Sequence, residues 1–526
     1  MFYKKGECKL NRLRRFIING TLMAVVAVIM RLVAVAFNVY ISNKIGAVAM
    51  GLFSLISTVY GFGITFATSG INLATTRLVA QAVGDTSTDK SSGEIKNSVE
   101  VRCILRRCIV YSLVFSTIAT LCLYFFAEKI GINVLKDERT IRSLKILALT
   151  FIPISLSSVL NGYFSAVRQV AKNAVTQILG QGIKIYASIA LLSVIMTNDV
   201  ESACVAVVCG GAISEAVSFV LSLALYLVGH KKSKKKADTV TKKRVTRDVL
   251  SNSLPLAFST YMRSALVTIE HILIPQGLQK SGSSKDLSLA AYGTVGGMVF
   301  PLVLFPSAVS ASFAGLLIPE VAESATTGDD RRIHGIINTV IETVLIYSIG
   351  CAGIIMSFSL SLGSTVYPEA NDAGKYILMI APLIPVMYID TAIDAMLKGL
   401  GEHVYSMCVN IADAFMSVIL VAILLPKMGI VGYIVTVYFT EIINATLSIT
   451  RLLSKTHVKT HVILWVGRPL ICIIVATRLT SRFCSFGNVW VNIIIASVIY
   501  LILMTLSGGI KIKWVINRIK YIVNEK

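Results

Sequence analysis

Charged residues are scarce in this sequence. Asp, Glu, Lys and Arg make up 15% of its 526 residues, against about a quarter in soluble globular proteins. Hydrophobic residues make up 55%, and the mean hydropathy is +0.74. These values exclude a soluble domain and indicate an all-α polytopic membrane protein.

Motifs of soluble enzymes and of metal sites are absent. The sequence has no G-x-x-x-x-G-K-[ST] phosphate loop, so it contains no nucleotide-driven pump of that kind. It has no H-E-x-x-H and no C-x-x-C, and its ten cysteines are scattered, as is typical of small apolar residues in helix packing. We therefore predict a protein that is not an enzyme and has neither a cofactor nor a metal site.

Acidic residues are few: 28, against 50 basic residues, for a formal net charge of +22. The basic residues cluster in short loops between apolar runs, which argues against nucleic acid as a partner and favours a membrane setting. The most basic stretch, 230–247, reads HKKSKKKADTVTKKRVTR, and half of it is Lys or Arg. Such a stretch cannot enter hydrocarbon and stays on the cytoplasmic side, so it predicts a cytoplasmic linker between two halves.

Fourteen apolar runs are long enough to cross a bilayer as helices. They lie at 16–41, 46–70, 107–127, 146–168, 174–196, 203–228, 249–275, 288–318, 334–361, 376–400, 404–425, 429–451, 461–479 and 488–507. An even number of spans puts both termini on one side. The segments then assigned to the cytoplasm hold most of the Lys and Arg, so we predict a multi-pass protein of the plasma (inner) membrane with both termini cytoplasmic.

The two halves of the chain resemble each other in pattern. The second span runs into SGINLATTRLVAQA and the eighth into SASFAGLLIPEVAE, each a broken apolar span followed by a small-residue amphipathic turn. Six spans per half give repeats of the same orientation, related by an axis along the membrane normal. The predicted domains are an N-lobe (1–229), the basic linker (230–247), a C-lobe (248–455), and two further helices with a basic tail (456–526).

Two segments are predicted to lie along the membrane surface. Ile71, Ala74, Leu78 and Ala82 share one face of a short helix after the second span. The tail 510–526 alternates apolar and basic residues, which is typical of an amphipathic helix on the inner leaflet.

Several stretches carry a resemblance to a known family. GTLMAVVAVIMRLVAVAFNVYISNKIGA and then GLFSLISTVYGFGITFATSGINLATTRLVAQA resemble the opening of the multidrug/oligosaccharidyl-lipid/polysaccharide exporter superfamily. YMRSALVTIEHILIPQGLQKSGSS and YGTVGGMVFPLVLFPSAVSASFAGLLIPEVAES are similar to the stage V sporulation protein B and polysaccharide biosynthesis flippase group within it. The resemblance covers essentially the whole chain. It implies two six-helix lobes in a MATE-like arrangement around a central cavity that opens alternately to each side, with two extra C-terminal helices.

Three cations inside predicted spans are candidates for substrate binding: Arg31, Lys184 and Arg263. A lysine or arginine facing lipid at mid-depth is costly, so each should face a cavity or a partner. A structural ion pair or snorkelling is the alternative. The resemblance implies that Arg31 matches an arginine that lines the cavity of lipid II flippases. Two further cavity cations of those proteins fall at Phe37 and near Gly296, where this chain has none.

Acidic residues inside spans are candidates for coupling transport to H⁺ or Na⁺. We select four of them: Asp390, Glu270, Asp413 and Glu441. Asp394 is excluded because Lys398 lies four residues later on the same helical face, which predicts a local ion pair.

The predicted function is a transporter that flips a lipid-linked oligosaccharide or a cell-wall or polysaccharide precursor across the membrane. Its partners would be a lipid-linked anionic saccharide, membrane lipids and H⁺ or Na⁺. One alternative is a multidrug cation antiporter of the same fold, which the cations in the first lobe disfavour. A remote alternative is a membrane-embedded glycosyltransferase, for which Glu369 and Asp372 form the one tidy pair of acids on an external loop.

Overall fold

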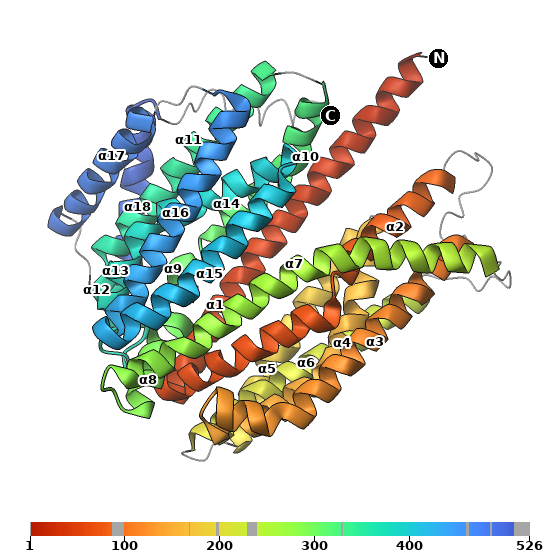
Figure 1. Ribbon diagram of the computed structural model, residues 1–526. Coiled ribbons are helices and arrows are strands. Elements are labelled where there is room, and N and C mark those ends of the chain that lie inside the picture. The colour runs from red at the N-terminus through yellow and green to blue at the C-terminus, as the bar shows by residue number, and fades with distance from the viewer. Residues whose placement is uncertain are drawn as a thin grey trace. The chain divides into compact units, whose positions relative to one another are not determined.

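The computed structural model of the chain is built from helices, and no strand occurs among the residues that it describes (Figure 1). The described residues are 2–86, 99–167, 169–195, 199–228, 239–327, 330–458, 462–483 and 487–509. Half of the basic linker (230–238) and the whole tail 510–526 therefore lie outside them.

The helices group into two compact units. The first unit comprises 1–37 and 48–293, and the second comprises 38–47 and 294–526. This division gives the helices of 239–292 to the first unit, although the sequence pattern makes them the start of the second repeat. The lobe boundaries drawn from the sequence remain a prediction.

The first unit contains seven long or medium helices and one short helix. They are α1 (Phe2–Thr68), α2 (Ile71–Thr86), α3 (Val99–Lys129), α4 (Ile141–Ala166), α5 (Val170–Ile195), α6 (Val200–Val228), α7 (Thr239–Lys280) and α8 (Lys285–Tyr292). Between α3 and α4 lie a π-helical turn (η2, Ile130–Val134) and a 3₁₀ turn (η3, Glu138–Thr140).

Helix α1 contains both of the first two predicted spans. The break between them is a kink at Gly46, whose φ of 80° and ψ of 170° are not helical. A residue with a Cβ would be strained at this positive φ, so glycine permits the sharp change of direction. The chain therefore turns from one span to the next without a loop.

Helix α7 begins at Thr239, inside the predicted linker. Lys and Arg are good helix formers, so a helix can continue from hydrocarbon into the aqueous layer when its terminal residues are basic. The basic stretch thus contributes the first turns of a helix as well as a connection.

The second unit contains one interrupted span followed by a helical bundle. Its helical elements are η4 (Gly293–Val299), α9 (Phe300–Leu304), α10 (Ser307–Thr327), α11 (Asp330–Ser357), α12 (Ser359–Val366), α13 (Ala373–Ile380), η5 (Ala381–Leu383), α14 (Ile384–Gly399), α15 (His403–Met428), α16 (Ile430–Thr456), α17 (Val462–Phe483) and α18 (Val489–Leu506). The predicted eighth span is broken into α8, the π-helix η4, α9 and α10. Pro301 and Pro306 lie near the later breaks, where the missing backbone N–H groups remove helical hydrogen bonds.

Twelve helical segments among the described residues are long and apolar enough to cross a membrane. The number differs from the predicted fourteen for two reasons: the first two spans are merged in α1, and the charged helix α7 is not among the twelve. The chain is a multi-pass, all-helical membrane protein, and the count of fourteen spans remains a prediction.

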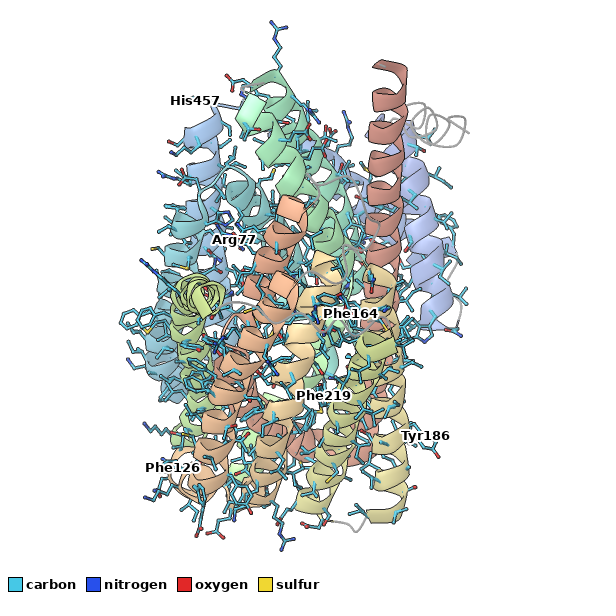
Figure 2. The ribbon with its side chains drawn as sticks, turned by 90° about the vertical axis from the view of Figure 1, so that its right-hand side faces the viewer. Arg77, Phe126, Phe164, Tyr186, Phe219 and His457 are labelled. Carbon is cyan, nitrogen blue, oxygen red and sulfur yellow. The ribbon has the colours of Figure 1, made fainter. Side chains whose placement is uncertain are left out.

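Large apolar side chains cover the outer surfaces of the helices. Figure 2 shows Tyr186 of α5 pointing away from the neighbouring helices, and its side chain is 77% exposed. Phe126 of α3 is also exposed. In a soluble protein such a surface would be unfavourable, whereas in a bilayer it contacts lipid.

Each unit has its own buried core. In the first, Ile71, Ala74, Leu78 and Ala82 are all buried, which confirms that they share one face of α2. In the second, the core runs along α11, which packs against α14 and α17. Both extra C-terminal helices join this core, with Ile473 of α17 packed close to Gly353 and Tyr500 of α18 packed close to Gly350.

Candidate functional site

A cavity of about 560 Å³ lies in the first unit between α7 and the part of α1 that follows the kink. Six hydroxyl side chains line it, together with a single arginine, Arg263. The lining residues are Ser57, Thr58, Gly61, Phe62, Thr65, Thr260, Arg263, Ser264, Val267, Thr268 and His271. A hydroxylated wall around one guanidinium is suited to binding a polar anion.

The spacing of small polar residues places this lining on one face of each helix. Ser57 and Thr65 are eight residues apart on α1, with Gly61 midway between them. On α7, Thr260 and Thr268 have the same separation. Residues four apart lie above one another on a helix, so each set forms a continuous polar stripe. Ser, Thr and Gly at intervals of four residues are visible in the sequence, but they do not stand out when only charged residues inside apolar spans are considered.

Hydrogen bonds join α1 to α7 beside the cavity. The hydroxyl of Tyr261 donates to Ser69 Oγ at 2.6 Å, and its ring packs 5.3 Å from that of Phe66. Ser264 Oγ donates to Thr65 Oγ1 at 3.3 Å within the cavity wall. These contacts fix the register of the two helices, and thereby the position of Arg263.

A buried tyrosine of α8, Tyr292, contacts two residues of the cavity wall. Tyr292 Oη lies 3.0 Å from His271 Nδ1, and it also forms a hydrogen bond with the side chain of Thr58. Tyr292 therefore connects α8 to both helices that form the cavity.

Arg263 is the only one of the three predicted substrate-binding cations that lines this cavity. Its side chain is exposed, and no ion pair or hydrogen bond joins it to another side chain in the part of the chain that the structure describes. A guanidinium stays charged even in surroundings of low polarity, and it offers five donors in a planar fork. It is therefore available for an anionic ligand.

The structure places Arg31 and Lys184 elsewhere. Arg31 is exposed on α1 before the kink and is not part of the cavity lining. Lys184 lies on α5 near Glu215 of α6, close enough for their charges to interact.

The packing of α5 against α6 explains why Lys184 and Glu215 lie near each other. Gly180 is in close contact with Ser218, and Gly210 with Ser188, so the two antiparallel helices touch on either side of Lys184. Ser214 Oγ also donates to the carbonyl of Gly180 at 2.7 Å. Lys184 therefore has an acidic neighbour inside the first unit.

The predicted coupling acids of the second unit are carried by three helices that pack together. Asp390 is on α14, Asp413 on α15 and Glu441 on α16, and all three side chains are partly buried. Asn444, one turn after Glu441, donates to Asp390 Oδ2 at 3.2 Å. This hydrogen bond places the polar face of α16 against α14.

The predicted local pair on α14 is confirmed. Lys398 Nζ donates to Asp394 Oδ2, and Ser406 of α15 donates to the other carboxylate oxygen. Asp394 is therefore a structural acid. Glu270, the remaining coupling candidate, is partly buried on α7, and its charge interacts with Tyr292.

The comparisons with known proteins decide the family. The model of the polysaccharide biosynthesis protein family matches residues 17–324, more than half of the chain. The chain belongs to this family. It is 24% identical over 430 residues to stage V sporulation protein B of Bacillus subtilis (strain 168), covering 79% of each chain. It is 22% identical over 411 residues to lipid II flippase MurJ of the same organism, covering 72% of this chain and 71% of that one.

Solved structures show that the fold is shared more widely. Lipid II flippase MurJ in an inward closed conformation matches with a TM-score of 0.70 at 14% identity, covering 92% of this chain and 98% of that one. A multidrug resistance MATE family transporter of the MOP superfamily, in an inward-facing conformation, matches with a TM-score of 0.65 at 14% identity, covering 82% and 98%. The family member described here therefore has the fold of the superfamily that its sequence resembles, and the predicted resemblance is confirmed.

Proposed function

We propose that this protein flips a lipid-linked oligosaccharide, or a cell-wall or polysaccharide precursor, across the plasma membrane by alternating access. The observation that carries the proposal is the cavity in which Arg263 is surrounded by hydroxyls. Membership of the polysaccharide biosynthesis family supports it, as does the likeness to a relative named as a lipid II flippase.

The chemistry of the cavity suits the headgroup of such a lipid. A phosphate group drawn into an apolar wall would be prohibitively costly without a charged partner. Arg263 supplies that partner, because a guanidinium binds two phosphate oxygens with parallel hydrogen bonds. Hydroxyl groups of serine and threonine both donate and accept, which matches the hydroxyls of a sugar. Arg31 would attract the anion along its route, whereas the charge of Lys184 is opposed by that of Glu215.

We assign ion coupling to acidic residues whose side chains are partly buried. Asp390, Asp413 and Glu441 lie on the packed helices α14, α15 and α16, and Glu270 lies on α7. Binding of H⁺ or Na⁺ by one of these carboxylates would change its charge and bias the equilibrium between the two states of the transporter. The basic linker and both termini would face the cytoplasm.

Reconstitution tests the proposal. Purified protein in liposomes is given a fluorescently labelled polyprenyl diphosphate disaccharide, and its transfer between leaflets is followed by quenching from outside. We expect transfer by the unsubstituted protein and its loss in Arg263→Ala. Equal transfer by the two would contradict the role of the cavity.

A further inference from the structure

The cavity wall contains a histidine, His271 of α7, that the proposed function does not yet use. Its Nδ1 lies 3.0 Å from Tyr292 Oη, and no other hydrogen bond to the ring occurs in the described part of the chain. Tyr292 is not part of the cavity lining. The side of the ring that carries Nδ1 therefore faces α8, and the opposite side, which carries Nε2, faces the cavity.

A count of protons shows which nitrogen of His271 carries hydrogen. The hydroxyl of Thr58 donates to the carbonyl of Ser54 at 2.9 Å. Because a hydroxyl has a single proton, Thr58 can only accept in its hydrogen bond with Tyr292. Tyr292 thus donates to Thr58 and must accept from His271 Nδ1. A neutral imidazole has one N–H, so Nε2 is left as an acceptor.

Other hydroxyls of the wall also use their protons within the protein. Thr65 donates to the carbonyl of Gly61 at 2.9 Å, and Thr268 donates to the carbonyl of Ser264 at 2.8 Å. The hydroxyl of Ser264 donates to Thr65 at 3.3 Å. These oxygens offer lone pairs to a ligand, whereas Arg263 offers charged N–H donors. The wall thus combines one cationic donor with several neutral acceptors.

Such a wall suits a phosphate that is attached to a group rich in hydrogen-bond donors. Arg263 and His271 are eight residues apart, about 12 Å along the axis of α7. A headgroup whose phosphate binds Arg263 needs a sugar to extend toward His271. Sugar hydroxyls and acetamido N–H groups are donors that an unprotonated Nε2 accepts. A site built around such a contact discriminates against an analogue that lacks the donor.

We propose that His271, held as the Nδ1–H tautomer by Tyr292, recognises the saccharide of the headgroup by accepting a hydrogen bond at Nε2 from a hydroxyl or an amide N–H. His271 would then distinguish a lipid diphosphate that bears a sugar from one that does not. Tyr292 is a positioning residue, because it acts through His271. The identity of the ligand rests on the proposed function, whereas the tautomer does not.

Nitrogen NMR tests the tautomer without any need for transport. The full-length protein is purified in detergent with isotope-labelled histidine, and the spectrum of His271→Gln identifies the His271 resonances among those of the six histidines. We expect a protonated Nδ1 and an unprotonated Nε2 at neutral pH. Tyr292→Phe removes the acceptor and should weaken the preference for Nδ1–H. A proton on Nε2, or on both nitrogens, in the unsubstituted protein would overturn the proposal.

The same resonances test recognition of the sugar. Maltose 1-phosphate should shift the Nε2 resonance of His271 in a saturable manner. Inorganic phosphate at equal concentration should not, because it has no sugar hydroxyl to donate. Arg263→Ala should weaken the effect of the sugar phosphate, since the phosphate loses its cationic partner. No shift with maltose 1-phosphate, or an equal shift with both compounds, would overturn the proposal.

Liposomes then compare a labelled polyprenyl diphosphate with and without its disaccharide. His271→Asn keeps an N–H near the Nδ1 position but has no group at the Nε2 position. It should lower transfer of the disaccharide lipid about fivefold, the scale of one neutral hydrogen bond, and leave the sugar-free lipid unchanged. His271→Gln should keep most of the transfer, because its amide oxygen reaches the Nε2 position. His403→Asn, at an exposed histidine of α15 outside the cavity lining, is the matched control and should change neither.

The outcomes separate this proposal from the proposed function. An equal loss with both lipids in His271→Asn would overturn recognition of the sugar, as would full transfer of the disaccharide lipid by that variant. Absent transfer of both lipids by the unsubstituted protein would contradict the proposed function. The NMR titration with maltose 1-phosphate would still decide the role of His271.

Discussion

Asn444 of α16 donates a hydrogen bond of 3.2 Å to the carboxylate of Asp390 on α14. An asparagine amide can hydrogen-bond a carboxylate without supplying a charge of its own. Asp394, one turn further along α14, is bonded by Lys398 and Ser406. The two acids thus have different predicted roles.

Substituting Asp390 should change ion dependence. Asp390→Asn should reduce transport severalfold and flatten its dependence on pH or Na⁺, because a neutral amide cannot bind the coupling ion in the same way. The measurement is lipid transfer in liposomes with imposed pH and Na⁺ gradients. Asp394→Asn is the control and should lower thermal stability while keeping the ion dependence. Normal gradient dependence in Asp390→Asn would assign Asp390 a structural role.

Arg31 should act in substrate attraction. Arg31→Ala should abolish or strongly reduce function, and Arg31→Lys should weaken it, because an ammonium binds phosphate through a point charge and not through a planar fork. Complementation or lipid transfer measures the effect. Arg478, an exposed arginine of α17 outside the cavity lining, provides the matched control as Arg478→Ala. Full activity of Arg31→Ala would remove this residue from the substrate path.

Lys184 and Glu215 should behave as a pair. Lys184→Met leaves a partly buried carboxylate without its nearby cation and should lower the thermal stability. Lys184→Glu with Glu215→Lys restores opposite charges and should recover much of the thermal stability measured in detergent. A swap that is no more stable than the single substitution would show that the two side chains do not act together.

Glu402 should give a pH-dependent contribution to stability. It lies between α14 and α15, where hydrogen bonds from Lys455 at 2.8 Å and from Arg451 at 2.7 Å lower its pKa below the ordinary 4.5. A depressed folded-state pKa means that the stabilisation is complete above the unfolded-state pKa and is lost as pH falls through the folded-state value. Glu402→Gln should therefore have a lower Tm than the unsubstituted protein at pH 7. The difference should shrink only below about pH 4.5; a constant difference down to pH 3 would contradict this.

Local sequence patterns predicted much of the fold. The buried face of α2 follows from the helical spacing of Ile71, Ala74, Leu78 and Ala82, and the Asp394–Lys398 pair follows from a spacing of four residues. Both depend on neighbours in the same helix. The sequence predicted two spans joined by a short connection near Gly46, where the structure has one kinked helix. A glycine in the sequence does not show whether a helix ends there or only bends.

The site was predicted less completely, because its parts come from different helices. Arg263 was identified from its charge inside an apolar span. The hydroxyl side chains around it are uncharged, and no single one of them indicates a site. The pairing of Lys184 with Glu215 depends on how α5 and α6 pack through their glycines, which is a tertiary relationship. Asp137 and Lys285 form an ion pair although they lie far apart in the sequence, so local spacing could not predict it.

The most direct test of the central claim compares two cargoes in the same liposomes. The unsubstituted protein, Arg263→Ala, Arg263→Lys and Arg478→Ala are each given the labelled polyprenyl diphosphate disaccharide and, separately, a cationic dye. The account predicts lipid transfer by the unsubstituted protein and by Arg478→Ala, weaker transfer by Arg263→Lys, none by Arg263→Ala, and no dye movement by any of them, because Arg263 attracts an anion and repels a cation. Dye export by the unsubstituted protein that persists or rises in Arg263→Ala, without lipid transfer, would contradict it.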